Sequence, residues 1–205
     1  MISKESADDL WNDAVLEAIR GRRSIRRFRA ERPEDEKLEA VVEAGRWAPS
    51  GSNRQSTRFL VIARPKTLDE LRALVRDEFA RMEPDEQTPA SVRSAILRSA
   101  RGGYDFCYGA PVLIVASNRR DSGNAMADSA CALENMMLAA YALGLGSCWI
   151  NQLRWLADVP AVVERMETLG VPREEAVCGA LALGFAEGDP VPAPARRGNP
   201  VVWLR

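Results

Sequence analysis

The stretch Val112-Leu113-Ile114-Val115-Ala116 contains only apolar residues. A strand of this composition suits the middle of a sheet whose two faces are both covered, because every one of its side chains then lies in an apolar environment. This segment therefore predicts a covered sheet. Three further apolar segments predict additional strands, at residues 59–63, 147–151 and 176–184.

The spacing of apolar residues predicts helices between these strands. The first is expected to run from Asp9 to Arg20, with Asp8 or Asp9 as its N-cap. The longest runs from Met126 to Leu143, and Gly144 or Gly146 is expected to end it in the left-handed conformation. The remaining predicted helices are one at residues 33–44 and two within residues 68–100, joined near Pro84 and Pro89.

The length of 205 residues corresponds to one large domain, and the composition of 46% hydrophobic and 28% charged residues is that of a globular protein. The first ten residues lack the basic start and apolar run of a signal peptide, so a cytoplasmic protein is expected. The uncharged run at 135–153 is interrupted by Gly144 and Gly146, which makes it a poor membrane span. No membrane association is therefore expected.

The chain contains no histidine, which removes the usual general base and the commonest metal ligand. If the protein is an enzyme, a bound cofactor is expected to carry the chemistry. The four cysteines are widely spaced, which fits neither a zinc site nor a disulfide framework. We expect buried, reduced thiols and no metal. The cysteines are Cys107, Cys131, Cys148 and Cys178.

The segment from Arg20 to Arg29 contains six arginines and no acid, in a chain whose formal net charge is only −1. Guanidinium groups match phosphate oxygens two at a time, and the Ser24 hydroxyl can add a hydrogen bond, so the segment predicts an anion site. Ile25 and Phe28 indicate attachment to the core. The alternative is a solvated basic turn. Nucleic-acid binding is disfavoured, because the net charge is near neutral and residues 69–86 are acidic.

A second unusual segment is Ala48-Pro49-Ser50-Gly51-Ser52-Asn53-Arg54-Gln55, which precedes the predicted strand at 59–63. Its small, turn-forming residues would let a ligand approach the backbone, although a plain helix-to-strand connection has the same composition. Residues 69–86 are expected to form a solvated face that could also cover a pocket. Tyr104, Phe106 and Tyr108 alternate along the chain, and we expect them to pack in the core rather than line a pocket.

The segments 22–26 and 48–55 resemble the two N-terminal flavin-binding segments of the nitroreductase family. Asp128, the run from Asn135 to Ala140 and the run from Gly144 to Ile150 are similar to the family's third signature, so the resemblance extends over most of the chain. It implies an α+β, three-layer α/β/α fold with a central mixed, mainly antiparallel sheet. It further implies a domain-entwined homodimer, in which residues 1–205 form a single domain and residues 188–205 are an extended C-terminal tail.

The resemblance implies that FMN is the cofactor and that NADH or NADPH is the co-substrate. The flavin carries the chemistry in this family, so no side chain is assigned as catalytic, and Arg26 is expected to stabilise negative charge near N1 and O2 of the ring. The backbone amide of Asn151 is the expected donor to the flavin N5. The expected cofactor-binding residues are Arg22, Arg23, Ser24, Arg26, Pro49, Ser50, Gly51, Asn53, Trp149, Ile150, Asn151, Arg196 and Arg197.

Within this set the resemblance separates three groups. Arg22, Ser24 and either Arg196 or Arg197 are expected to hold the phosphate. The loop at 49–53 is expected to reach the flavin of the other subunit, and residues 149–151 to lie against the ring. The dimer is expected to form through the long helix, with Trp203 anchoring the tail on the partner. Small residues on that helix favour close approach; they are Ala127, Ala130, Cys131, Ala139 and Ala142.

The implied activity is a ping-pong reaction, in which hydride passes from NAD(P)H to the flavin and then to an electron-poor small molecule such as a nitroaromatic or a quinone. The chain has no Gly-x-Gly-x-x-Gly after a strand, so no separate dinucleotide-binding fold is expected. Ser56-Thr57-Arg58 departs from the proline and aromatic residue of many relatives, which affects the shape of the substrate pocket. The alternatives are a reductive dehalogenase or a flavin-fragmenting enzyme of the same fold, and a non-catalytic flavin-binding protein.

Overall fold

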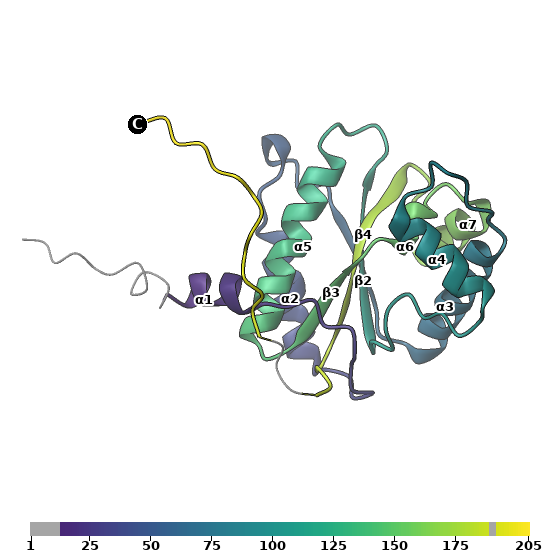
Figure 1. Ribbon diagram of the computed structural model, residues 1–205, viewed down its shortest axis with the longest axis horizontal. Coiled ribbons are helices and arrows are strands. Elements are labelled where there is room, and N and C mark those ends of the chain that lie inside the picture. The colour runs from purple at the N-terminus through teal and green to yellow at the C-terminus, as the bar shows by residue number, and fades with distance from the viewer. Residues whose placement is uncertain (1–12, 189–191) are drawn as a thin grey trace, which may run out of the picture.

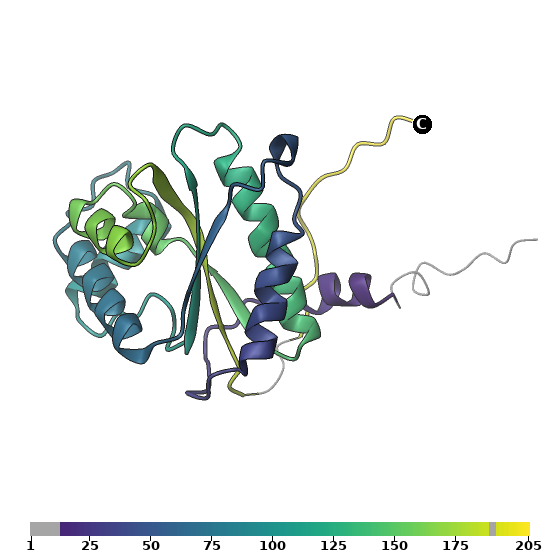
Figure 2. The same cartoon turned by 180° about the vertical axis from the view of Figure 1, so that it is seen from behind.

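The computed structural model describes residues 13–188 and 192–205. A four-stranded sheet lies between two layers of helices (Figures 1 and 2). The strands are β1 (Arg58–Ile62), β2 (Val112–Arg119), β3 (Gly146–Ile150) and β4 (Glu175–Gly184). On one side of the sheet lie α1 (Ala14–Gly21), α2 (Asp35–Arg46) and α5 (Ala125–Ala142); on the other lie α3 (Pro65–Ala80), α4 (Ala90–Ala100), α6 (Gln152–Trp155) and α7 (Pro160–Thr168).

The strand order is β1-β2-β4-β3, and every neighbouring pair is antiparallel. The two central strands, β2 and β4, pair along most of their length, with a register shift between Ala116 and Ser117. Among the described residues, the one parallel pairing is an isolated bridge between Ser24 and Ser147. The predicted α+β fold with a mainly antiparallel sheet is therefore confirmed.

The covered sheet predicted from the apolar run is also confirmed. Alternate residues of β2 point to opposite faces, as a strand requires. Leu113 and Val115 belong to the core on the α3 side, which also contains Phe79. Ile114 belongs to the core on the α5 side, where it packs with residues such as Leu133. Both faces of the central strands are thus removed from water.

The predicted helices and strands are all present, with ends that differ by a few residues. The first helix begins at Ala14 and is capped by Asp13, whose side chain accepts a hydrogen bond from the Val15 backbone N–H. The predicted N-cap at Asp8 or Asp9 lies outside the described residues. Gly144 or Gly146 was predicted to end the long helix in the left-handed conformation. Gly144 does so, because it follows α5 with a φ of 73°, whereas Gly146 lies in β3.

Helix α5 has apolar residues on two faces. One face, with Leu133, Met136 and Ala140, is buried against the sheet. The opposite face, here called the outer face of α5, exposes Ala127, Cys131, Tyr141 and Ala142. None of the helices in the described part of the chain has the length and apolar character needed to cross a bilayer.

The end of the chain forms neither helix nor strand over residues 192–205. It passes the α5 side of the molecule and then leads away from it, as the yellow segment of Figure 1 shows. Three apolar residues shortly before its end are exposed: Val202 is 84%, Trp203 70% and Leu204 96% exposed. Residues 189–191, which connect the tail to β4, lie outside the described residues.

Candidate functional site

A cleft of about 470 Å³ lies where the arginine-rich segment crosses the end of β3. The segment is tied to the sheet by a hydrogen bond from the Ile25 N–H to the Ser147 carbonyl, 2.9 Å long, and by the bridge between Phe28 and Ala186. Gly146 allows this close approach, because a Cβ at this position would lie 2.9 Å from the Ile25 side chain. We call this cavity the basic cleft; its lining includes Arg23, Ser24, Arg26, Arg27, Tyr141 and Glu187.

The structure brings Arg23, Ser24 and Arg26 into the basic cleft, but it places Arg22 elsewhere. Arg22 forms an ion pair with Glu134 of α5, with 3.2 Å between Nη2 and Oε1. Arg23 donates from Nη1 to the Arg20 carbonyl at 2.9 Å. The Nε atoms of both Arg22 and Arg23 are buried without a hydrogen-bond partner among the described residues. Such orphaned donors are costly unless a ligand supplies an acceptor.

A second cavity, of about 570 Å³, contains the other predicted segment. The Gly51 N–H donates to Oδ1 of the buried Asp128 at 2.9 Å, and a Cβ on Gly51 would lie 2.0 Å from Asn124 Nδ2. We call this cavity the loop cavity; its lining includes Trp47, Pro49, Ser50, Asn53, Gln55 and Asp128.

The backbone around the loop cavity is strained. Ser52, Asn53 and Gln55 have φ values of 54°, 52° and 50°, in the left-handed region that non-glycine residues rarely adopt. Each such residue costs on the order of 1–3 kcal/mol, and residues of this kind cluster at functional sites. A plain connecting loop would not need three of them, so this geometry favours the ligand-binding interpretation of the segment.

The two cavities lie at opposite ends of α5. Asp128 lines the loop cavity, Tyr141 lines the basic cleft, and no residue lines both. At 1.5 Å per residue, the helix separates the two positions by about 20 Å. One protomer therefore does not bring the two predicted segments to the same ligand.

The residues at the end of β3 and directly after it differ partly from their prediction. Ile150 is only 1% exposed and packs in the core on the α3 side, so its side chain does not face a cavity. The Trp149 indole Nε1 donates to Asn151 Oδ1 at 2.8 Å. The Asn151 N–H donates to Gln152 Oε1 at 3.1 Å, and Gln152 Nε2 donates to the Tyr104 hydroxyl at 2.7 Å. A ligand that accepts from the Asn151 N–H must therefore displace Gln152.

The two arginines of the tail do not join the basic cleft of their own chain. Arg196 and Arg197 are both exposed, and neither forms a hydrogen bond or ion pair among the described residues. The structure thus separates the predicted phosphate ligands into three places. Ser24 lies in the cleft, Arg22 faces α5, and Arg196 and Arg197 are exposed on the tail. Arg23 and Arg26, which were predicted to bind other parts of the cofactor, lie in the cleft with Ser24.

Sequence reasoning missed the polar contacts around the segment that precedes β2. Tyr104 and Phe106 are buried, as expected, but Tyr108 is half-buried and its ring lies 5.9 Å from the Arg26 guanidinium carbon. Gln152 and Arg72, which hold this region, carried no signal in the sequence.

The prediction of four buried thiols is wrong for Cys131, which is exposed on α5, whereas the other three are buried.

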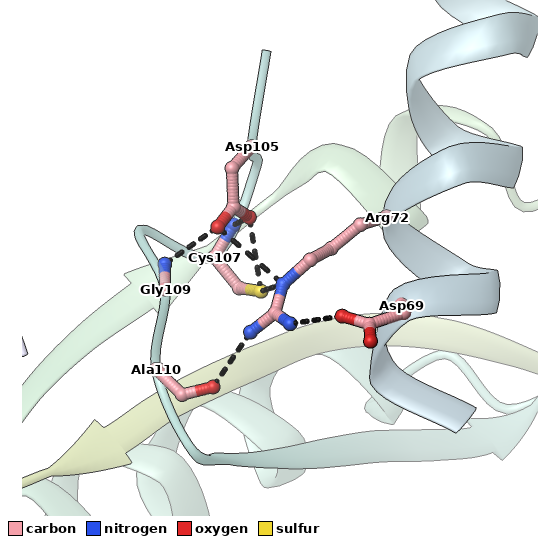
Figure 3. A network of polar contacts seen from close by, with 6 residues as sticks. All are labelled: Asp69, Arg72, Asp105, Cys107, Gly109 and Ala110. Carbon is pink, nitrogen blue, oxygen red and sulfur yellow. Dashed lines mark hydrogen bonds and ion pairs between the residues drawn. The ribbon is translucent and has the colours of Figure 1, made fainter. Parts of the chain in front are cut away.

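Cys107 lies in a polar network between α3 and the segment before β2 (Figure 3). Its thiol donates to Asp105 Oδ1 at 3.2 Å and accepts from Arg72 Nε at 3.2 Å. Burial raises the pKa of the Cys107 thiol to about 12, and the Asp105 carboxylate acts in the same direction against the opposing charge of Arg72. The thiol is therefore neutral and unreactive at physiological pH.

The pKa of Cys107 predicts a loss of stability at alkaline pH. The thiol ionises near its ordinary pKa of 9.0 in the unfolded chain but near 12 in the folded protein. The unfolded state therefore binds fewer protons between these values, and the free energy of unfolding should fall by up to about 1.4 kcal/mol per pH unit. Urea denaturation across this pH range measures the slope. Cys107→Ala should reduce the slope and Cys131→Ala should not; equal slopes in all three proteins would contradict the assignment.

Comparison with known proteins agrees with this architecture. Residues 19–185 match the model of the nitroreductase family. A nitroreductase with bound FMN from Bacteroides fragilis is 34% identical, with a TM-score of 0.85 over 95% of this chain and 100% of that chain. A nitroreductase with bound FMN from Desulfitobacterium hafniense is 28% identical, with a TM-score of 0.79 over 94% of this chain and 99% of that chain.

Among curated proteins, an NADPH-flavin oxidoreductase from Vibrio harveyi is 29% identical over 194 residues, which cover 92% of this chain and 72% of that protein. The family model spans most of the chain, and the two similar structures match it over nearly their full length. The chain therefore belongs to the nitroreductase family.

Proposed function

We propose that the protein is an FMN-dependent oxidoreductase that works as a homodimer. In this proposal NADH or NADPH supplies a hydride, and an electron-poor small molecule such as a nitroaromatic or a quinone receives the electrons. The observation that carries the proposal is the basic cleft, in which Arg23, Ser24 and Arg26 converge in a member of a family whose similar structures contain FMN. The absence of histidine from the sequence agrees with chemistry carried by a cofactor.

The residues of the basic cleft fit a phosphorylated ligand. The orphaned Nε of Arg23 needs an acceptor, and phosphate oxygens accept from guanidinium groups in paired hydrogen bonds. The exposed Ser24 hydroxyl can add a further bond. Arg22 could join them only by leaving Glu134, and Arg196 or Arg197 only by a movement of the exposed tail. We therefore assign the phosphate first to Arg23 and Ser24.

A homodimer would complete the site that one protomer leaves divided. The basic cleft and the loop cavity lie about 20 Å apart along α5. If two copies pack through the outer faces of α5 in antiparallel directions, the loop cavity of each copy meets the basic cleft of the other. The exposed apolar residues of the outer face and of the tail support this arrangement, because a monomer would leave them in water.

FMN, when bound, would accept and release the two electrons. The contribution of the chain is positioning and electrostatics. Arg26 presents a permanent positive charge in the cleft, where it can stabilise the negative charge of a reduced ring. The Asn151 N–H can donate to the ring if Gln152 Oε1 releases it. Arg26 must therefore stay in place, whereas the hydrogen bond between Asn151 and Gln152 must break when a ligand binds.

The proposal predicts a yellow protein that NAD(P)H bleaches. The purified protein should absorb at about 450 nm, as oxidised flavins do. Under nitrogen, addition of NADH or NADPH should remove this absorbance, and a nitroaromatic or quinone should restore it. A yellow protein that neither donor bleaches would instead be a flavin carrier. A colourless protein that does not take up added FMN would contradict the proposal altogether.

A further inference from the structure

The segment between α4 and β2 holds an unusual backbone conformation at Tyr108. The φ of Tyr108 is 59°, and that of the following Gly109 is 71°. The side chain of Asp105 spans this turn, since it accepts from the Cys107 N–H at 2.9 Å and from the Gly109 N–H at 2.6 Å. A tyrosine in the left-handed region persists only where surrounding contacts determine it. The Asp105 carboxylate provides those contacts on both sides of Tyr108.

Arg72 of α3 fixes the same turn to the body of the protein, as Figure 3 shows. Its guanidinium group donates to the Ala110 carbonyl at 2.8 Å and lies 3.4 Å from Asp105 Oδ2. It also donates to Cys107 Sγ at 3.2 Å and to Asp69 Oδ1 at 2.8 Å. The Arg72 side chain is 21% exposed, so these bonds are partly shielded from water. We call Arg72 and Asp105 together the turn clamp.

The turn clamp presents the ring of Tyr108 to Arg26. The Arg26 guanidinium carbon lies 5.9 Å from the centre of that ring, within the range of a cation–π interaction. Arg26 is otherwise exposed, and within the described part of the chain it also makes a long hydrogen bond of 3.5 Å to the Ser24 carbonyl. A flexible arginine on the surface would sample several rotamers, and the ring restricts that choice.

We infer that Arg72 and Asp105 are positioning residues that act through Tyr108 to hold the Arg26 guanidinium in the basic cleft. The contact between Arg26 and Tyr108 rests on the geometry alone, whereas its consequence for a flavin rests on the proposed function. Without the clamp, Tyr108 is expected to leave its left-handed conformation and Arg26 to turn more often into solvent. Arg72 and Asp105 lie outside the basic cleft, and through Tyr108 they determine where the positive charge of Arg26 lies inside it.

The first test is the reduction potential of bound FMN in Asp105→Asn. A cation–π contact at an exposed site corresponds to a change of about threefold in equilibrium constant, or about 14 mV for a two-electron couple, and the potential should fall by about that amount. Asp69→Asn is the matched control, because Asp69 also bonds Arg72 but does not touch the turn. The inference would be overturned if the reduction potential fell equally in Asp105→Asn and Asp69→Asn, or if it did not fall in Asp105→Asn.

The second test is a double-mutant cycle with Tyr108. Tyr108→Leu should lower the potential as Asp105→Asn does, whereas Tyr108→Phe keeps the ring and should not. In the Tyr108→Leu background, Asp105→Asn should have no further effect, because the residue through which it acts is gone. Full additivity of the two changes would show that Asp105 acts by another route. The Tyr108 pair leaves the clamp intact, so it tests the contact between the ring and Arg26 even if Asp105→Asn folds poorly; equal potentials in Tyr108→Leu and Tyr108→Phe would overturn the inference.

The third test needs no flavin. In the FMN-free protein, the NMR signal of the Arg26 Nε–H should shift in the same direction in Asp105→Asn and Tyr108→Leu, because the first moves the ring away from Arg26 and the second removes the ring. Asp69→Asn and Tyr108→Phe should leave the signal in place. An unmoved signal in Asp105→Asn would overturn the positioning role. A protein that behaves as predicted here but binds no FMN would instead count against the proposed function alone.

Discussion

Cys131→Glu is expected to convert the protein into a monomer that no longer retains FMN. Cys131 is exposed on the outer face of α5, next to the half-exposed Glu134. If this face packs on its counterpart, the substitution buries two additional carboxylates, one from each copy, beside two that are already present. Burying an unpaired charge costs several kcal/mol, which is a large part of the free energy of a typical dimer.

The loss of FMN should accompany the loss of the dimer, because the basic cleft and the loop cavity would no longer meet. Light scattering after gel filtration measures the mass, and absorbance at about 450 nm measures bound flavin. Leu97→Glu is the matched control. Leu97 is a 45% exposed residue of α4, on the other side of the sheet, and its substitution should change neither quantity. A dimeric Cys131→Glu protein would show that the copies do not pack through this face, and a monomer that keeps its flavin would show that the site is not shared between copies.

Arg26→Ala is expected to slow the reduction of bound FMN by NADH or NADPH about 100-fold. Removal of one group that stabilises developing charge in an active site typically has an effect of this order. The thermal stability of the FMN-free protein should hardly change, because Arg26 is exposed and its contacts with the described part of the chain are weak, namely the Tyr108 ring and a long hydrogen bond to the Ser24 carbonyl. Stopped-flow absorbance under nitrogen measures the rate.

Arg29→Ala provides the control for Arg26→Ala. Arg29 belongs to the same basic segment and is exposed, but its side chain does not line the basic cleft. Its removal changes the net charge equally and should alter the reduction rate by less than about twofold, since exposed charges are screened by salt. If Arg26→Ala keeps the parent's flavin content and reduction rate, Arg26 has no part in the reaction.

Local pattern was sufficient to predict the strands and helices. The apolar run at 112–116 required a strand buried on both faces, and the spacing of apolar residues from Met126 to Leu143 required a long helix. These features depend on neighbours within a few residues, so the sequence alone carries them. The resemblance of two short segments to flavin-binding segments also depended only on the order of residues within each segment. The family that it indicated is confirmed.

The positions of the site residues depended on contacts between distant parts of the chain. Nothing near Arg22 in the sequence indicates that Glu134 would pair with it, and nothing near Ile150 indicates that its side chain faces the core. An alternating strand sends neighbouring residues to opposite faces, and which face receives a ligand is decided by the elements that cover the sheet. The predicted roles of the arginines and of residues 149–151 remain predictions for that reason.

The sequence by itself determined the strands and helices, the basic segment and the loop of small residues, because backbone preference and apolar periodicity act over short distances. The α+β fold followed from the resemblance of short segments to the nitroreductase family. Only the tertiary structure decided that Arg23 and Arg26 share a cleft, that the loop cavity lies about 20 Å away, and that Tyr108 covers Arg26. Such contacts arise when packing of the two cores brings remote segments together. Their geometry is a property of the whole fold rather than of any one segment.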